Sequence, residues 1–339
     1  MNATSTSSAL EDSSGEGQVS ELCMDIVKVS LLFFGIFGIF GNFNIILATY
    51  THKSLRSKCG LLLAILAFCD FWCLAFELLS AVRILTNTAE MPRKHCFWSI
   101  SFYLFIENVE SYMIFAVGFD RLLAICLPIK YMLFRARYYV PLIIVPGVVY
   151  SVTLMVLGIV YLDDATIPVC NPPLAYANFT ADVWNYTTMI ICLTTIIVYV
   201  STYTMLYKIA PKHASLNALA QIKVQKIMVK TLTVNVLAYF SSSLLSALLI
   251  AVMRAIRLSK DAIADVETYA VIPGLLSYSI NYYVYFWRSS EYRSAFKKQL
   301  RCYCLTRKVK KIGQGALFTT RVDNGYMRHF SMSMTRASG

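Results

Sequence analysis

Seven stretches of apolar residues, each about 20 residues or longer, follow one another along the chain. A run of this length crosses the hydrocarbon core of a bilayer as a helix, in which every backbone group is paired internally. The alternating pattern of a membrane barrel strand does not occur. The sequence therefore predicts an all-α membrane protein, a seven-transmembrane helix bundle with spans at Ile26–Tyr50, Cys59–Arg83, Phe97–Leu127, Tyr139–Leu162, Asn185–Ile209, Val224–Met253 and Val266–Arg288.

The composition agrees with burial in lipid. Apolar residues make up 57% of the 339 residues and charged residues 15%, and the mean hydropathy is +0.57. Soluble domains contain about 45–50% apolar and about 25% charged residues, so a water-soluble enzyme is disfavoured. The short connections favour one bundle over two domains.

The distribution of charge predicts the orientation of the bundle. If the N-terminus lies outside, only seven of the 31 Lys and Arg residues fall in outer segments, and most acidic residues fall there. This asymmetry is the positive-inside rule, so the net charge of +12 reflects topology and attraction to lipid headgroups, with no nucleic-acid partner. We expect an extracellular segment 1–25, a bundle 26–288, a membrane-surface helix 289–304 and a cytoplasmic tail 305–339 in the plasma membrane.

Glycosylation sequons lie on the predicted outer side at Asn2 and Asn178. Asn185 also begins a sequon, but it lies at the start of the fifth span and is a weaker candidate. The first 25 residues are polar and acidic and lack the apolar core of a cleavable signal peptide.

The predicted topology sorts the ten cysteines by compartment. Outside lie Cys23, Cys96 and Cys170, where an oxidising environment permits a Cys96–Cys170 disulfide that would pin the outer loop across the bundle. The alternative is two free thiols, and Cys23 is left over. Inside, Cys302 and Cys304 follow a basic amphipathic stretch, which suits palmitoylation as well as it suits unmodified thiols.

The third span carries the most polar groups. Several of its residues recur at spacings of three and four and so share one helix face. Acidic side chains at this depth are costly against lipid, so the face must look into the bundle. It consists of Tyr103, Glu107, Glu110, Ile114, Val117 and Arg121.

Several motifs then occur in register. Asp120-Arg121-Leu122 ends the third span, with Pro128 seven residues after Arg121 and Cys96 25 residues before it. Gly41-Asn42, Leu66-Ala-Phe-Cys-Asp70 and Asn281-Tyr-Tyr-Val-Tyr285 lie in the first, second and seventh spans. Over about residues 25–300 the chain resembles the rhodopsin-like G protein-coupled receptors. Leu55-Arg-Ser-Lys-Cys59 and Glu291-Tyr-Arg-Ser-Ala-Phe296 make it most similar to the nematode chemosensory receptors of serpentine receptor class SX.

The resemblance implies coupling to a heterotrimeric G protein through five residues. Asp120 would hold Arg121 in the resting state and release it in the active state. The other three coupling residues would be Pro128, Asn281 and Tyr285. The alternative for the Asp-Arg pair is an interfacial basic anchor.

The resemblance also implies a buried ion site. Asp70 matches the family's buried carboxylate, which can hold sodium, and Glu110 occupies the facing position of the third span. Two such carboxyls hold a cation or share a proton, with Asn42, Ser277 and Asn281 as candidate neighbours. The alternative is a protonated Glu110 that only bonds a neighbouring helix.

The ligand, an extracellular small molecule or peptide, is expected in the outer half. Glu107 and Glu77 are candidates to bind a cationic group of the ligand, and Tyr103 is a candidate for a cation–π contact with that group. Phe240 is the candidate equivalent of the family's tryptophan in the sixth span. Against this, Arg83 or Lys94 could neutralise Glu107. A simple monoamine is disfavoured because Tyr103 replaces the usual amine-binding aspartate.

Departures from the family pattern concern helix movement. Leu122 replaces tyrosine and Tyr282 replaces proline, the fourth span lacks tryptophan, and the fifth and sixth lack their usual proline motifs. The absence of a proline after Asn281 predicts a weaker break in the seventh helix.

Two other classes of membrane protein also have seven helices. An intramembrane metallohydrolase needs histidine ligands inside the bundle, yet none of the four histidines lies within a span. A seven-helix transporter or ligand-gated cation channel is the alternative, although inverted repeats are not visible. We expect no enzyme, no cofactor and no metal beyond the candidate sodium at Asp70 and Glu110.

Overall fold

The computed structural model describes most of the bundle. It covers residues 20–86, 88, 90–167, 169–209 and 271–301, with residues 226, 229, 230, 232–234, 236, 237, 240, 241, 252, 256, 266, 268 and 269 between them. Asn2, Cys302, Cys304 and the side chain of Asn178 lie outside the described residues, so the glycosylation and palmitoylation sites stay predictions.

Long helices dominate the described chain. They are α1 (Glu21–Thr51), α2 (Lys58–Leu85), α4 (Ser101–Cys126), α6 (Ala136–Val160), α8 (Asn178–Thr204) and α11 (Val271–Arg288). Short helices are η1 (Lys53–Leu55), α3 (Arg93–Ser99), α5 (Pro128–Leu133), α7 (Pro172–Ala175) and the π-helical turn η2 (Met205–Ile209). Residues 290–301 form a further helix, within the range expected for the membrane-surface helix, and the described residues of the sixth span from 226 to 252 are helical.

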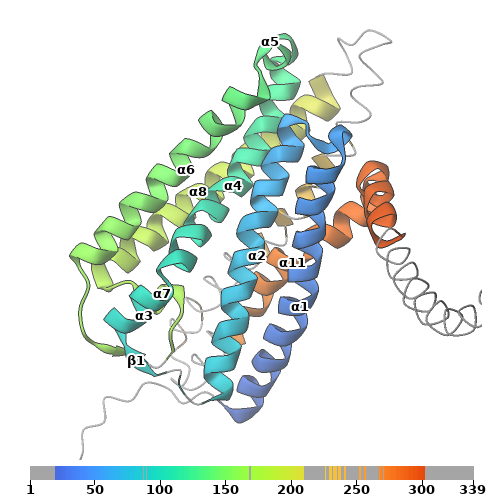
Figure 1. Cartoon of the computed structure of the whole chain (residues 1–339). Helices are drawn as coiled ribbons and strands as arrows, with labels where there is room; N and C mark the ends of the chain where they lie inside the picture. Colours follow the sequence, from blue (N-terminus) through green and yellow to red (C-terminus); the bar gives the residue numbers. More distant parts are fainter. Residues whose placement is uncertain are drawn as a thin grey trace, which may run out of the picture.

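The helices pack side by side with α4 in the middle (Figure 1). One flank of α4 contacts α2, and its other contacts are with α6 and α8. α1 packs against α2 and α11. At one end of the bundle lies α5, and at the other lie α3, α7 and the strand β1 (Met91–Pro92), which pairs antiparallel with β2 (Thr166–Ile167).

Among the residues that the structure describes, four helices are apolar and long enough to cross a membrane: α1, α2, α6 and the stretch Phe179–Lys208. α4 is as long as α6 but contains Glu107, Glu110, Asp120 and Arg121, which lower its hydropathy. Because it is surrounded by protein, α4 can contain charged side chains that would be costly against lipid.

The third span differs from its prediction. A single helix was expected from Phe97 to Leu127, but α3 ends at Ser99 and α4 begins at Ser101. Ile100 between them has φ −115° and ψ 15°, outside the helical region. Cys96 therefore lies on α3. The first and fifth helices also begin earlier than predicted, at Glu21 and Asn178, because these ends are polar and the hydropathy pattern does not record them.

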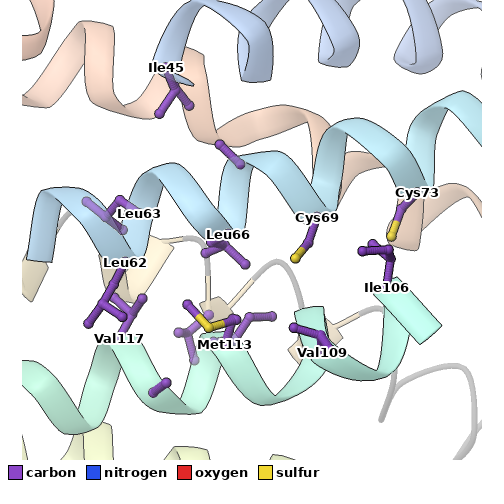
Figure 2. Close-up of a cluster of buried hydrophobic side chains, with 14 of the residues drawn as sticks. Ile45, Leu62, Leu63, Leu66, Cys69, Cys73, Ile106, Val109, Met113 and Val117 are labelled. Atoms are coloured by element: carbon purple, nitrogen blue, oxygen red, sulfur yellow. The ribbon is translucent and has the colours of Figure 1, made fainter. Parts of the chain in front are cut away.

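The apolar core lies where α2 faces α4. Leu62, Leu66 and Cys69 of α2 point toward Val109, Met113 and Val117 of α4 in the close-up (Figure 2). Leu62 and Met113 are fully buried. This contact sets the relative positions of the two helices that hold Asp70 and Glu110.

Glycines allow α1 to approach its neighbours closely. A Cβ atom on Gly38 would lie 2.8 Å from Ser279 Cβ of α11 and closer still to the side chain of Leu74, and one on Gly41 would lie 2.7 Å from Tyr282 Cβ. Small residues of this kind let membrane helices pack backbone against backbone.

We predict that Gly38→Ala lowers the unfolding midpoint of the purified protein, because overpacking this contact costs about 1–3 kcal/mol. Gly274→Ala is the control, since a Cβ there meets nothing within 4 Å and alanine favours a helix. Equal midpoints for the two variants, measured by thermal unfolding in detergent, would contradict this packing.

Candidate functional site

Three groups of polar residues line the interior of the bundle. The end that holds α5 is called the inner end, and the end that holds α3 and α7 the outer end, after the orientation that the charge pattern predicts (Figure 1). At the inner end, Arg121 folds back on the adjacent Asp120, with Arg121 Nε donating to Asp120 Oδ2 at 2.9 Å and an ion pair from its Nη2. Asp120 is fully buried and Arg121 is 4% exposed. The predicted pairing is therefore present, and the guanidinium is enclosed by protein.

Tyr131 of α5 closes this pair, a role that the sequence analysis missed. Its hydroxyl donates to Asp120 Oδ1 at 3.0 Å and accepts from Arg121 Nη2 at 3.0 Å. Burial raises the pKa of Tyr131 above its usual value, so the hydroxyl keeps its proton and remains a donor. The sequence did contain a signal for this role: Tyr131 lies ten residues after Arg121 and three residues after Pro128, which begins α5.

In the middle of the bundle, Asn281 of α11 donates to Asp70 Oδ2 of α2 at 2.6 Å. A cavity of about 20 Å³ lies beside this contact, and its polar lining residues are Glu110, Ser277 and Asn281. The rest of its lining is Tyr199 and apolar side chains, and Asp70 does not line it, contrary to the prediction that Asp70 and Glu110 share one ion site. This volume has room for one water molecule or one bare ion. Glu110 is 1% exposed and its Oε2 atom has no hydrogen-bond partner among the described residues.

The donor set of this cavity suits a hard cation. All candidate ligands are carboxyl, hydroxyl or amide oxygens, which such ions prefer, and Glu110 Oε2 is available. Asn42 does not line the cavity, contrary to its expected place as a neighbour. Instead its Nδ2 donates to the carbonyl of Tyr278 at 2.9 Å and ties α1 to α11. Within the described ranges, no group of three or more His, Cys, Asp or Glu residues is placed to hold a metal.

In the outer half, Tyr103 of α4 donates from its hydroxyl to Glu77 Oε1 of α2 at 2.5 Å. One face of its ring is covered by Phe76, stacked at 5.4 Å, so that face cannot make a cation–π contact. Tyr103 is 2% exposed. Glu107 lies one turn further along α4, half-buried, and its Oε2 atom has no partner among the described residues.

The basic residues suggested as partners of Glu107 bind elsewhere. Arg83 donates from Nη2 to Ser99 Oγ at 3.2 Å, and Lys94 lies 4.0 Å from Asp164 in the outer loop. Internal neutralisation of Glu107 by Arg83 or Lys94 is thus not seen in the structure.

Asn108 of α4 is a second residue that the sequence analysis missed. Its Nδ2 donates to Tyr176 Oη of the outer loop at 3.1 Å, and its Oδ1 accepts from Trp184 Nε1 of α8 at 3.0 Å. Asn108 is 1% exposed, so it joins α4 to α8 and to the outer loop in the interior of the protein. An asparagine in a membrane span was itself a signal, because such groups bond across helices.

The expected disulfide between Cys96 and Cys170 is present and joins α3 to the segment between β2 and α7. The same loop is tied by an ion pair between Arg93 and Asp163. Cys23, left over in the sequence, is fully buried on α1.

Tyr285 and Phe240 also lie in the interior of the bundle, whereas Pro128 is exposed at the start of α5. Tyr285 is buried at the inner end of α11 and stacks on Tyr292 at 5.1 Å. α11 continues as a helix through Asn281 and Tyr282, as the absence of a proline there suggested. Phe240 is half-buried and packs against the main core.

This arrangement can be compared with known proteins. Residues 35–300 match the serpentine type 7TM GPCR chemoreceptor Srsx family. The chain belongs to this Srsx chemoreceptor family. It is therefore a multi-pass membrane protein of a receptor family, and the enzyme classes weighed above do not apply.

Curated relatives of the Srsx chain match it over shorter stretches. Olfactory receptor 1468 of Rattus norvegicus is 31% identical over 98 residues, covering 28% of this chain and 30% of the relative. Olfactory receptor-like protein I9 of Rattus norvegicus is 27% identical over 138 residues, or 38% and 43% of the two chains. Olfactory receptor 7G2 of Homo sapiens is 29% identical over 138 residues, or 38% and 42%. The chain thus spans less than half the length of these relatives.

The cavity leads to a prediction about ions and protons. Glu110→Gln should alter the response of basal activity to sodium and to pH, because it removes one of the two carboxyl groups that are predicted to hold a cation or share a proton. The measurement is basal nucleotide exchange on a G protein across titrations of sodium and pH. Glu90→Gln, at an exposed outer position, is the control. Identical responses of the Glu110 variant and the wild type in both titrations would contradict the ion site.

Proposed function

We propose that this chain is a chemoreceptor that transmits binding of an extracellular small molecule or peptide to a heterotrimeric G protein. The observation that carries the proposal is the placement of polar groups along α4. Its outer half presents Glu107, which has an unpartnered carboxylate oxygen, and its inner end presents the enclosed Asp120–Arg121 pair. One rigid helix therefore connects the place where a ligand enters with the place where a partner would bind.

Signalling requires two packings of the bundle with different affinities for ligand and G protein. In the described packing Arg121 is enclosed by Asp120 and Tyr131. A shift that separates Tyr131 from the pair frees the guanidinium for a partner on the cytoplasmic side. The coupling of the two sites then follows from which packing each ligand prefers.

The proposed orientation puts the N-terminus outside and the tail in the cytoplasm of a cell with the receptor in its plasma membrane. The charge asymmetry supports it. An independent support is the Cys96–Cys170 disulfide, because α3, which holds Cys96, lies at the end of the bundle opposite α5 (Figure 1). Disulfides persist on the extracytoplasmic side of a membrane and thiols stay reduced in the cytosol.

We predict that Arg121→Ala abolishes basal and agonist-dependent nucleotide exchange without loss of surface expression, because the proposed contact with the G protein disappears. Arg137→Ala is the control, an exposed arginine one helix away. Surface expression is measured with an N-terminal epitope on intact cells, which also tests the orientation. Normal exchange by a well-expressed Arg121→Ala variant would refute the assignment, and an ion current from the wild-type chain would favour a channel.

We further propose that a cationic group of the ligand binds at Glu107. No ion pair of the described residues involves Glu77 or Glu107, and an unpaired carboxylate in a membrane interior is costly. An amine or guanidinium of the ligand would remove that cost. The hydrogen bond from Tyr103 occupies Glu77, which leaves Glu107 as the contact.

This proposal predicts the outcome of a ligand screen with charged and neutral compounds of matched size. Agonists with a cationic group should lose about tenfold or more in potency on Glu107→Gln, since a desolvated charge pair is lost. Neutral agonists should keep their potency on that variant, and all agonists should keep it on Glu90→Gln. Cationic agonists that activate Glu107→Gln at unchanged concentrations would contradict the contact.

A further inference from the structure

The second inner connection depends on a single side chain. α5 has six residues, and all of them except Tyr131 are exposed. A helix of this length is not stable by itself in solution. The contacts of Tyr131 must therefore determine where α5 lies, and through α5 whether the tyrosine hydroxyl reaches Asp120.

Lys58, the first residue of α2, supplies contacts to Tyr131 from the opposite side. Its Nζ donates to the backbone carbonyl of Tyr131. The same ammonium lies 4.1 Å from the centre of the Tyr131 ring and 5.1 Å from that of Tyr139 on α6. The two rings pack edge to face at 5.6 Å, so the ammonium lies against both of them.

The chemistry of these contacts matches a lysine. The carbonyl of Tyr131 belongs to the last turn of α5, where carbonyl groups lack helical partners and carry the negative end of the helix dipole. A cation there pairs the carbonyl and interacts with the faces of two aromatic rings. Ser57 fixes the start of α2 by accepting from the Gly60 amide at 3.1 Å, so the lysine projects from a defined backbone.

We infer that Lys58 is a positioning residue: it holds α5 against α2 and α6 so that the Tyr131 hydroxyl stays on Asp120 and Arg121. The first inner connection thereby controls how firmly the arginine is enclosed. The effect on signalling rests on the proposed function of Arg121, whereas the position of α5 does not.

The position of α5 is tested by hydrogen–deuterium exchange of amides 129–134 in the purified full-length receptor. Loss of a hydrogen bond and of cation–π contacts should raise their exchange about tenfold in Lys58→Met. Exchange in Lys58→Gln should fall between that of the wild type and that of Lys58→Met, because glutamine keeps a hydrogen-bond donor without the charge. Lys58→Arg should restore slow exchange. Lys53→Gln, an exposed lysine of the same connection, is the control. Exchange in Lys58→Met equal to the control would overturn the inference, since methionine preserves the packing of the side-chain stem.

The signalling consequence is tested by basal nucleotide exchange at matched surface expression. Lys58→Met should raise basal exchange about threefold or more, because Arg121 is released more often. In a Tyr131→Phe background the same substitution should add nothing, since the hydroxyl that Lys58 positions is gone. An equal increase in both backgrounds would show that Lys58 does not act through Tyr131. If wild type and Arg121→Ala show the same basal exchange, the proposed function fails while the amide exchange still decides the role of Lys58.

Discussion

Charged and strongly polar side chains within a membrane must face protein or water, and α4 carries many of them. Glu107, Asn108 and Glu110 lie along its middle, and Asp120 and Arg121 at its inner end. Lipid cannot solvate these groups, so α4 has to be surrounded by other helices. Its contacts with α2, α6 and α8 follow from that requirement, and the polar groups of the candidate sites are brought together as a consequence.

The helices that surround α4 are held by different means. Between membrane helices the hydrophobic effect is weak, so close packing and hydrogen bonds across helices provide the attraction. Gly38 and Gly41 permit the close contact of α1 with α11, and Asn42 adds a hydrogen bond to the carbonyl of Tyr278. On the other side, Asn108 joins α4 to Trp184 of α8 and to the outer loop.

The two ends of the bundle are stabilised in contrasting ways. The outer end has a covalent bond and an ion pair of Arg93 with Asp163, which hold the loop firmly. The inner end depends on the hydrogen bonds of Tyr131 and on the ammonium of Lys58. Non-covalent contacts at the inner end can separate and re-form, as a two-state receptor requires.

The sequence by itself determined the helical membrane architecture, the inward face of the third span and the outer cysteine pair, because each follows from local pattern and from the cost of burying charge in lipid. It also indicated Asp70, Glu110 and Arg121 as the polar groups of the interior. Only the tertiary structure decided that Tyr131 contacts Arg121 and that Lys58 contacts Tyr131. It also decided that Asn108 joins the outer loop to α8, and that Asn42 faces a backbone carbonyl instead of the cavity. These contacts join residues on different helices and connections, and their geometry depends on how the helices pack.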